Sequence, residues 1–429
     1  MHLSRRVSVV MLCLYVMARP VRLVAQTSAE RPPALEAPRI GLYDTVARVL
    51  TRTWPPTQLR GSEVADQIRL ARPAADSART FGDELRVVNS LLRTLPASHL
   101  GLTSASAAGA LTAALRGVRA PTLGMQLLEW QGRWYATTVL DGGPARRAGV
   151  RDWDEILSIN GTTPERSPLV DYRNDDAYLD DDRDPPVHPF VVSPGDTVRL
   201  ALRAEPDSTL TLDVAVAPYS AWDGTQASLE VIEVDSVRVG IVHLWYMHTR
   251  AVAGWLSNRF DDEWRNVGAI LLDLRGRGGD GALATRIDNL LSGEPGRARF
   301  RGPVVALQDR MTRSAKEVLL DMLQRRGSAR LVGEPSAGAV LGSAETMLGH
   351  GLALLHPVSI VDGAAGRLEG RPVTPDVHVA WGGPLSGGRD PIFDAGLQEV
   401  TRLVAAFGKG TVLPAIHNED LRKTRGLRP

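Results

Sequence analysis

The feature that most constrains the fold is an alternation of short apolar runs and helical segments in the C-terminal half of the chain. Apolar runs lie at residues 239–244, 269–274, 304–307 and 329–332, and helical periodicity covers 281–291 and 314–324. Short apolar runs that alternate with helices in this way are typical of buried strands in a layered α/β fold. The pattern therefore predicts an α/β core over residues 228–404.

The part of the chain before this core follows two other patterns. Apolar residues recur at helical spacing between residues 40 and 95, which predicts a helical N-terminal domain over 37–101. Residues 120–218 instead carry short alternating runs separated by turn signals such as Asn160-Gly161. We expect a multidomain α/β protein with a helical N-terminal part, a β-rich module, the α/β core and a C-terminal tail over 405–429.

The first 26 residues are typical of an export signal. Basic residues precede an apolar run at residues 7–18, which is shorter than the roughly 20 residues that span a bilayer. Small residues near Ala25 suit a cleavage site. We expect a cleaved signal peptide over 1–26 and an exported protein, periplasmic or secreted, and an uncleaved membrane anchor is the alternative. Leu12 is a poor fit to a lipoprotein cleavage site before Cys13, so no lipid anchor is predicted.

Composition excludes several classes of function. The formal net charge is +1 and no basic stripe stands out, so neither nucleic acid nor an anionic membrane is an expected partner. Cys13 is the only cysteine, and it lies in the predicted signal. The mature chain therefore lacks disulfides, thiol catalysis and thiolate metal sites. His243 and His248 do not have a ligand-like helical spacing, so we predict no metal and no cofactor.

Ser314 is a candidate nucleophile because it stands between a predicted strand and a predicted helix. The first N–H groups of a helix are unpaired and its N-terminal end is positive, which stabilises an oxyanion formed beside it. Ser314 and Glu317 also match a capping box, a pattern that starts helices in many proteins that are not enzymes. The segment alone leaves both interpretations open.

A glycine-rich segment, residues 273–281, joins another strand to a helix; we call it the glycine turn. It does not match a phosphate loop, because no Gly-Lys-Ser/Thr follows. Gly276, Gly278 and Gly281 have the spacing of a dinucleotide site, but no acidic residue ends a second strand about 20 residues later. A tight strand-to-helix turn is the favoured interpretation, ahead of an anion site.

A serine nucleophile needs a base, and the sequence narrows the candidates. The only lysines are Lys316, Lys409 and Lys423. Lys316 lies two residues after Ser314 on the same predicted helix, so the two side chains diverge. One of the nine histidines is the better candidate. His99 lies in a loop, but a lone loop histidine is usually solvated, so spacing alone does not select it.

Together these segments resemble the tricorn and C-terminal-processing (tail-specific) family of serine peptidases. The resemblance covers nearly the whole mature chain and keeps the order of the family's parts. The segments that carry it are Leu95 to His99, Gly142 to Gly149, Asp154 to Gly161, Leu271 to Gly279, Thr312 to Glu317, Leu331 to Ala339 and Leu368 to Asp376. The resemblance implies a PDZ-like module over 120–218 and a ClpP/crotonase-like catalytic core.

One departure selects a branch of this family. Ser-Lys members carry their lysine at the position of Ala339, so the resemblance points to the tricorn-like branch, which uses serine and histidine with a second serine and a glutamate. It implies the following roles: Ser314 as nucleophile, His99 as base, Ser98 as adjacent hydroxyl, Glu369 as orienting carboxylate, and the N–H groups of Gly278 and Ala315 as the oxyanion hole.

The same resemblance implies polypeptide substrates. Leu123, Gly124 and Met125 resemble the carboxylate-binding loop of a PDZ domain, beside which an exposed strand edge takes a peptide by β-addition. Two other functions stay open: a catalytically inactive protein that binds peptides or apolar ligands, as in the related retinoid-binding protein of the eye, and a PDZ-type envelope scaffold. The oligomeric state is also open, with a homo-oligomer among the candidates.

Overall fold

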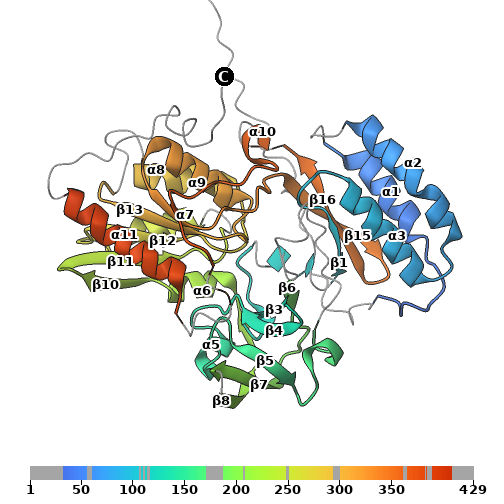
Figure 1. The fold of residues 1–429 in the computed structure, drawn as a ribbon, viewed down its shortest axis with the longest axis horizontal. Helices are drawn as coiled ribbons and strands as arrows, with labels where there is room; N and C mark the ends of the chain where they lie inside the picture. The colour runs from blue at the N-terminus through green and yellow to red at the C-terminus, as the bar shows by residue number, and fades with distance from the viewer. Residues whose placement is uncertain are drawn as a thin grey trace, which may run out of the picture.

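The computed structural model describes residues 32–55, 60–105, 108–109, 112–113, 116–170, 187–205, 208–247, 251–292, 300–360, 365–381, 383 and 389–407. The predicted signal peptide, nearly all of the predicted tail and His248 lie outside the described residues. Figure 1 shows three regions: a helical unit, an α/β unit and a β-rich module below them. The predicted fold class is therefore confirmed.

Three helices form the N-terminal unit: α1 (Leu42–Thr53), α2 (Gly61–Ser77) and α3 (Phe81–Thr94). The Thr80 hydroxyl accepts the Asp83 N–H, and the Asp83 carboxylate accepts the Thr80 N–H, so α3 begins with a capping box. The helices pack on a three-stranded sheet, β1 (Gly101–Ser104), β16 (Leu352–Ser359) and β15 (Gly342–Gly349). Two of these strands come from late in the chain, so the N-terminal helices share one core with the C-terminal part.

The β-rich module contains a six-stranded antiparallel sheet in the order β6-β3-β4-β5-β7-β8. Its apolar core includes Leu127, Ile159 and Leu200, all fully buried or nearly so. The strands are β3 (Gln126–Trp130), β4 (Arg133–Thr137), β5 (Glu155–Ile159), β6 (Val187–Pro189), β7 (Thr197–Glu205) and β8 (Ser208–Ala215). The helix α5 (Pro144–Ala148) and the strand pair β2 (Ala120–Thr122) and β9 (Ala217–Tyr219) complete the module.

The α/β unit is built on a second six-stranded sheet, in the order β10-β11-β12-β13-β14-β17. β10 pairs antiparallel with β11, and the remaining pairs are parallel. The strands are β10 (Glu230–Val234), β11 (Val237–His243), β12 (Ala269–Asp273), β13 (Val304–Gln308), β14 (Arg330–Gly333) and β17 (Val377–His378). Four of them match the apolar runs of the sequence.

Helices cover both faces of this sheet (Figure 1). On one face α7 (Ala251–Arg259), α8 (Ala282–Ser292) and α9 (Ala315–Arg326) share a core with residues such as Leu272 and Ala306. On the other face α11 (Pro391–Phe407) packs on residues such as Leu271 and Leu307. Successive residues of each strand point to opposite faces of the sheet, and helices cover both faces. The runs are therefore apolar throughout. The short helices α6 (Ala221–Ala227) and α10 (Ala365–Leu368) lie in the connections.

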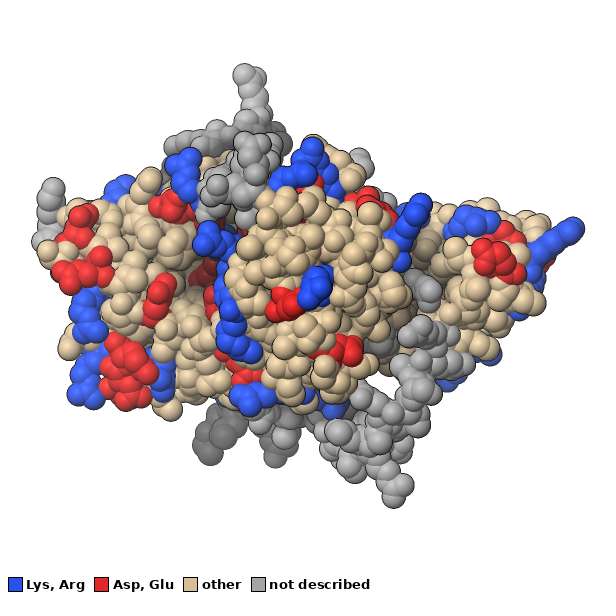
Figure 2. Space-filling model, turned by 90° about the horizontal axis from the view of Figure 1, so that it is seen from below, with Lys and Arg blue, Asp and Glu red and all other residues tan. Residues whose placement is uncertain are grey.

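Neither positive nor negative charge dominates the face of the molecule in Figure 2. On the face drawn in Figure 2, basic and acidic side chains of the described residues are interspersed. Within the described part of the chain, no helix is both long and apolar enough to span a bilayer.

Candidate active site

Ser314 stands at the N-terminal end of α9 in a strained backbone conformation. Its φ is 59° and its ψ is −127°, a combination that residues other than glycine rarely adopt. Its N–H donates to the Ala339 carbonyl at 2.7 Å. The backbone of the serine is therefore held in place by the Ala339 carbonyl.

Glu317 organises the loop beside the nucleophile. Its side chain is buried, and its carboxylate accepts hydrogen bonds from the Ser336 hydroxyl at 2.5 Å and from the N–H groups of Gly338 at 2.6 Å and Ala339 at 2.8 Å. It also accepts the Ser314 N–H at 3.2 Å. Burial raises the pKa of Glu317 to about 7. The sequence motif identified Glu317 only as a capping residue, whereas the structure makes it the centre of the 336–339 loop.

Gly278 lies in direct contact with the nucleophile. A Cβ atom at this position would come within 2.5 Å of the Arg313 carbonyl and 2.6 Å of the Ser314 Cβ, so only glycine allows this approach. The same position lies 3.2 Å from the backbone nitrogen of Ala315, the first residue of α9. The structure thus brings both predicted oxyanion-hole residues beside Ser314.

Charged groups anchor the glycine turn that contains Gly278. The Arg275 guanidinium donates to Asp273 at 2.6 Å and to Asp390 at 2.7 Å, and the Gly276 N–H donates to Asp309 at 3.0 Å. Burial alone would raise the pKa of Asp273, but Arg275 overcomes this effect and holds the pKa well below its usual range. The turn is therefore fixed by ionised groups close to the nucleophile.

Ser98, His99 and Glu369 form a chain of hydrogen bonds, which we call the relay. The Ser98 hydroxyl donates to Glu369 Oε2 at 3.1 Å, and the Ser98 N–H donates to Oε1 at 2.8 Å. His99 Nδ1 lies 2.9 Å from the Ser98 Oγ. Because the hydroxyl proton points to the carboxylate, the oxygen must accept from Nδ1–H. This tautomer leaves the lone pair on Nε2, as a general base requires.

The relay connects to the nucleophile through two residues of backbone. Glu369 Oε2 accepts the Val340 N–H at 2.9 Å, and the preceding carbonyl, that of Ala339, accepts the Ser314 N–H. Burial raises the pKa of Glu369. The side chains of Ser98, His99 and Glu369 are all buried. Residues 98–99, 314 and 369, distant in sequence, are thus held around the dipeptide 339–340.

Lys316 points away from this arrangement, as its spacing predicted. Its ammonium donates to the Arg275 carbonyl at 2.7 Å and to the Trp245 carbonyl at 3.4 Å. Ala339, at the position of the lysine in Ser-Lys peptidases, is buried.

The strand that follows the predicted peptide-binding loop has both of its edges paired with other strands. Leu123 and Met125 are buried, and Gly124 has a left-handed φ of 70°. The strand β3 that follows pairs with β4 along one edge and with β6 along the other. The free edge that the sequence analysis expected at β3 is therefore occupied by residues 187–189, and the role of Leu123, Gly124 and Met125 stays a prediction.

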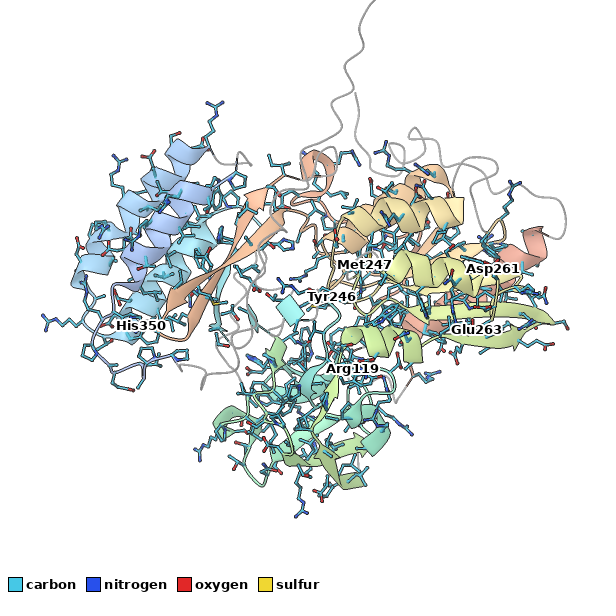
Figure 3. The ribbon with its side chains drawn as sticks, turned by 180° about the vertical axis from the view of Figure 1, so that it is seen from behind. Arg119, Tyr246, Met247, Asp261, Glu263 and His350 are labelled. Carbon is cyan, nitrogen blue, oxygen red and sulfur yellow. The ribbon has the colours of Figure 1, made fainter. Side chains whose placement is uncertain are left out.

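A cavity of about 1500 Å³ separates the β-rich module from the core. Trp153 and Tyr135 line it from the module, and Tyr246, Arg277 and Met311 line it from the core. Tyr246 lies where the two regions meet (Figure 3). The cavity reaches residues that flank the nucleophile and the glycine turn, but Ser314 itself is not among its lining residues.

An aromatic contact joins the module to the segment before the nucleophile. Trp381 of the core lies 5.4 Å from Trp130 and 4.6 Å from Trp153, both in the module, measured between ring centroids. The Arg310 guanidinium lies over the Trp381 ring at 5.0 Å and forms an ion pair with Glu334 at 3.2 Å. No pattern in the sequence predicted this contact.

A strained serine at a helix N-terminus, connected through the backbone of residues 339–340 to a buried Ser-His-Glu relay, is consistent with a hydrolase that acts through an activated serine. Residues 283–379, which include Ser314, Glu317 and Glu369, match the model of peptidase family S41. The matched segment lies within the C-terminal part of the chain and supports a serine-type peptidase. His99 and Ser98 lie outside the matched segment.

Several solved structures are similar over most of the chain. A photosystem II D1 C-terminal processing protease is 18% identical, with a TM-score of 0.49, and the match covers 79% of this chain and 92% of that one. Mature CPAF complexed with lactacystin is 12% identical, with a TM-score of 0.49, and the match covers 86% and 99%. The tricorn protease is 15% identical, with a TM-score of 0.46, and the match covers 85% and 36%.

Proposed function

We propose that this chain is an exported endopeptidase that cleaves polypeptides with Ser314 as nucleophile. His99 is the general base, Ser98 and Glu369 orient it, and the N–H groups of Gly278 and Ala315 form the oxyanion hole. The observation that carries the proposal is the buried relay of Ser98, His99 and Glu369, whose carboxylate accepts the Val340 N–H next to the Ala339 carbonyl that accepts the Ser314 N–H.

The first half of the reaction forms an acyl-enzyme. His99 Nε2 takes the hydroxyl proton of Ser314 as Oγ attacks the carbonyl carbon of the scissile peptide bond. The carbonyl electron pair moves to oxygen, and the two backbone N–H groups hold the resulting oxyanion, each contributing on the order of 3 kcal/mol. The imidazolium then gives its proton to the amide nitrogen, the C–N bond breaks, and the amine product leaves.

The second half releases the acyl group. His99 takes a proton from water, and the hydroxide oxygen attacks the ester carbon. The second oxyanion collapses, the bond to Ser314 Oγ breaks, and the imidazolium returns the proton to that oxygen. The products are two shorter peptides and the starting enzyme.

The relay matters because the imidazole must hold one tautomer and must tolerate a positive charge. The Ser98 oxygen accepts the Nδ1–H of His99, and the Ser98 hydroxyl donates a hydrogen bond to Glu369. The carboxylate thus stabilises the imidazolium through one intervening hydroxyl instead of by direct contact.

The β-rich module is proposed to hold the substrate as a PDZ-like domain. The cavity between module and core is large enough for an extended segment of polypeptide and ends beside the residues that flank Ser314. Because β6 covers the edge of β3, β-addition there requires that residues 187–189 detach. The N-terminal sequence supports export to the periplasm or the medium.

Serine-directed labelling tests the proposal. We expect a fluorophosphonate to label the wild type at Ser314 and casein to be cleaved, whereas Ser314→Ala abolishes both. Exchange of the exposed Ser343 for alanine is the matched control and should change neither. Absence of labelling, with binding of peptides or apolar ligands intact, would favour the ligand-binding protein on the same scaffold.

A further inference from the structure

Lys316 is buried where a lysine is unfavourable. It is fully buried at the second position of α9, and it is the only lysine among the residues that the structure describes. The N-terminal turn of a helix repels a cation, and burial of a charge is costly. Stability alone therefore does not explain why this position carries a lysine.

The contacts of Lys316 join three elements of the core. Its ammonium donates to the carbonyl of Arg275, which follows β12, and to that of Trp245, which follows β11. These strands are parallel neighbours, so both carbonyls lie at the same edge of the sheet. Lys316 thereby ties this edge to the beginning of α9.

The same contact fixes one end of the glycine turn. Arg275 lies three residues before Gly278, which touches Ser314. The side chain of Arg275 is held by Asp273 and Asp390, whereas its carbonyl is held by Lys316 at 2.7 Å. A shift of that carbonyl would rotate the following peptide units and move the Gly278 N–H.

We propose that Lys316 is a positioning residue for the oxyanion hole: its ammonium holds the Arg275 carbonyl and so aims the Gly278 N–H at the oxygen that becomes negative when Ser314 attacks. This inference rests on the proposed function. We do not assign Lys316 as the base, because its Nζ is held by the Arg275 and Trp245 carbonyls, at the ends of β12 and β11.

The charge of Lys316 changes near neutral pH. Burial lowers its pKa to about 7, an effect that Asp273 and Asp309 oppose and Arg275 reinforces. His243, at the end of β11, lies beside Asp273. Burial lowers the pKa of His243 to about 4, so this side chain stays neutral above about pH 6. Hydrogen bonds from a charged donor are about twice as strong as those from a neutral one. The support of the turn should weaken as pH rises through 7.

The test compares the wild type with Lys316→Met, which keeps most of the unbranched side chain and removes its donors. Turnover is measured per serine titrated with a fluorophosphonate, so that misfolded molecules are not counted. We expect kcat to fall about tenfold with KM unchanged, because a displaced oxyanion donor weakens only the transition state. Leu320→Met, at a buried position of α9 in the apolar core, is the control and should keep its kcat.

A pH series separates positioning from a merely structural role. The ratio of wild-type kcat to that of Lys316→Met should be largest at pH 6 and should shrink toward pH 8.5, since the contribution of His99 cancels in the ratio. Lys316→Gln, which keeps a neutral donor, should show an intermediate loss and little change with pH. A ratio of one, or a ratio that does not change with pH, would overturn the inference while the active wild type upholds the proposed function. Failure of the wild type to be labelled would overturn both.

Discussion

The two sides of the candidate site are built from different kinds of interaction. On the histidine side, one carboxylate, one hydroxyl and one imidazole form the relay, and the neutral Ser98 hydroxyl lies between the carboxylate and the imidazole. On the serine side, ionised groups dominate, and the Arg275 guanidinium lies between two carboxylates within 3 Å of each. The two sides meet at the dipeptide 339–340.

The difference follows from what each side must do. A proton has to move to and from His99, so its surroundings must favour neither protonation state too strongly. An oxyanion hole has to present fixed dipoles that do not reorganise during the reaction, and ionic contacts around the glycine turn supply that rigidity. Substitutions on the histidine side should therefore act on proton transfer, and those on the serine side should act on geometry and stability.

Removal of the base should have the largest effect. We expect His99→Ala to lower kcat on the order of 10⁴-fold or more, because members of such a catalytic unit fail together. Casein or peptide turnover by purified protein provides the measurement. His350→Asn is the control: His350 lies in the turn between β15 and β16, well apart from Tyr246 in Figure 3, and asparagine tolerates its left-handed φ of 51°. Wild-type turnover in His99→Ala would show that another residue is the base.

Interruption of the relay should have the next largest effect. We expect Ser98→Ala to lower kcat about 10²-fold, because Nδ1 loses its acceptor and the imidazolium loses its link to Glu369. Ser98→Thr keeps the hydroxyl and should recover part of the loss. Equal turnover in the wild type and Ser98→Ala would mean that the relay is only structural.

On the serine side, Glu317→Gln should disturb the nucleophile loop. One oxygen of Glu317 accepts from Ser336 and Gly338, and the other accepts from Ala339 and Ser314, so an amide nitrogen would face donors. We expect kcat to fall about tenfold and the free energy of unfolding to fall by about 1–3 kcal/mol. Urea unfolding and turnover are measured beside Glu263→Gln, an exposed carboxylate at the far side of the core (Figure 3), which should change little. Unchanged stability in Glu317→Gln would contradict this assignment.

The smallest effect is a change in stability with pH at Lys316. Its pKa is about 7 in the fold and 10.5 ordinarily, so the unfolded chain binds more protons between these values, and the free energy of unfolding rises with pH across that window. We expect Lys316→Met to be more stable than the wild type by about 1–3 kcal/mol at pH 6.5. The advantage should narrow toward pH 10, as followed by urea unfolding. A variant less stable than the wild type at pH 6.5 would refute this prediction.

The sequence predicted the parts of the fold that depend on local pattern. The strands β11 to β14 and the helices α8 and α9 follow from apolar periodicity, because each is buried against neighbours along its whole length. The pairing of β1 with β16 could not be seen, since antiparallel contacts between distant segments leave no periodic signal. The covering of β3 by β6 was missed for the same reason.

The site was only partly accessible to sequence reasoning. Ser98 and Glu369 lie 271 residues apart, and only the family resemblance connected them. Ser314 and Gly278 stood out because a helix start and a glycine-rich turn have local signatures. No sequence pattern predicts the contacts of Lys316, because its acceptors are backbone carbonyls, which every residue type has.

The structure of the covalent fluorophosphonate adduct tests the central claim most directly. We predict phosphorus bound to Ser314 Oγ, its non-bridging oxygen within about 3 Å of the N–H groups of Gly278 and Ala315, and His99 Nε2 within about 3.2 Å of Oγ or one water from it. An adduct whose oxygen points away from both N–H groups, with the His99 ring on another face of the molecule, would contradict the account.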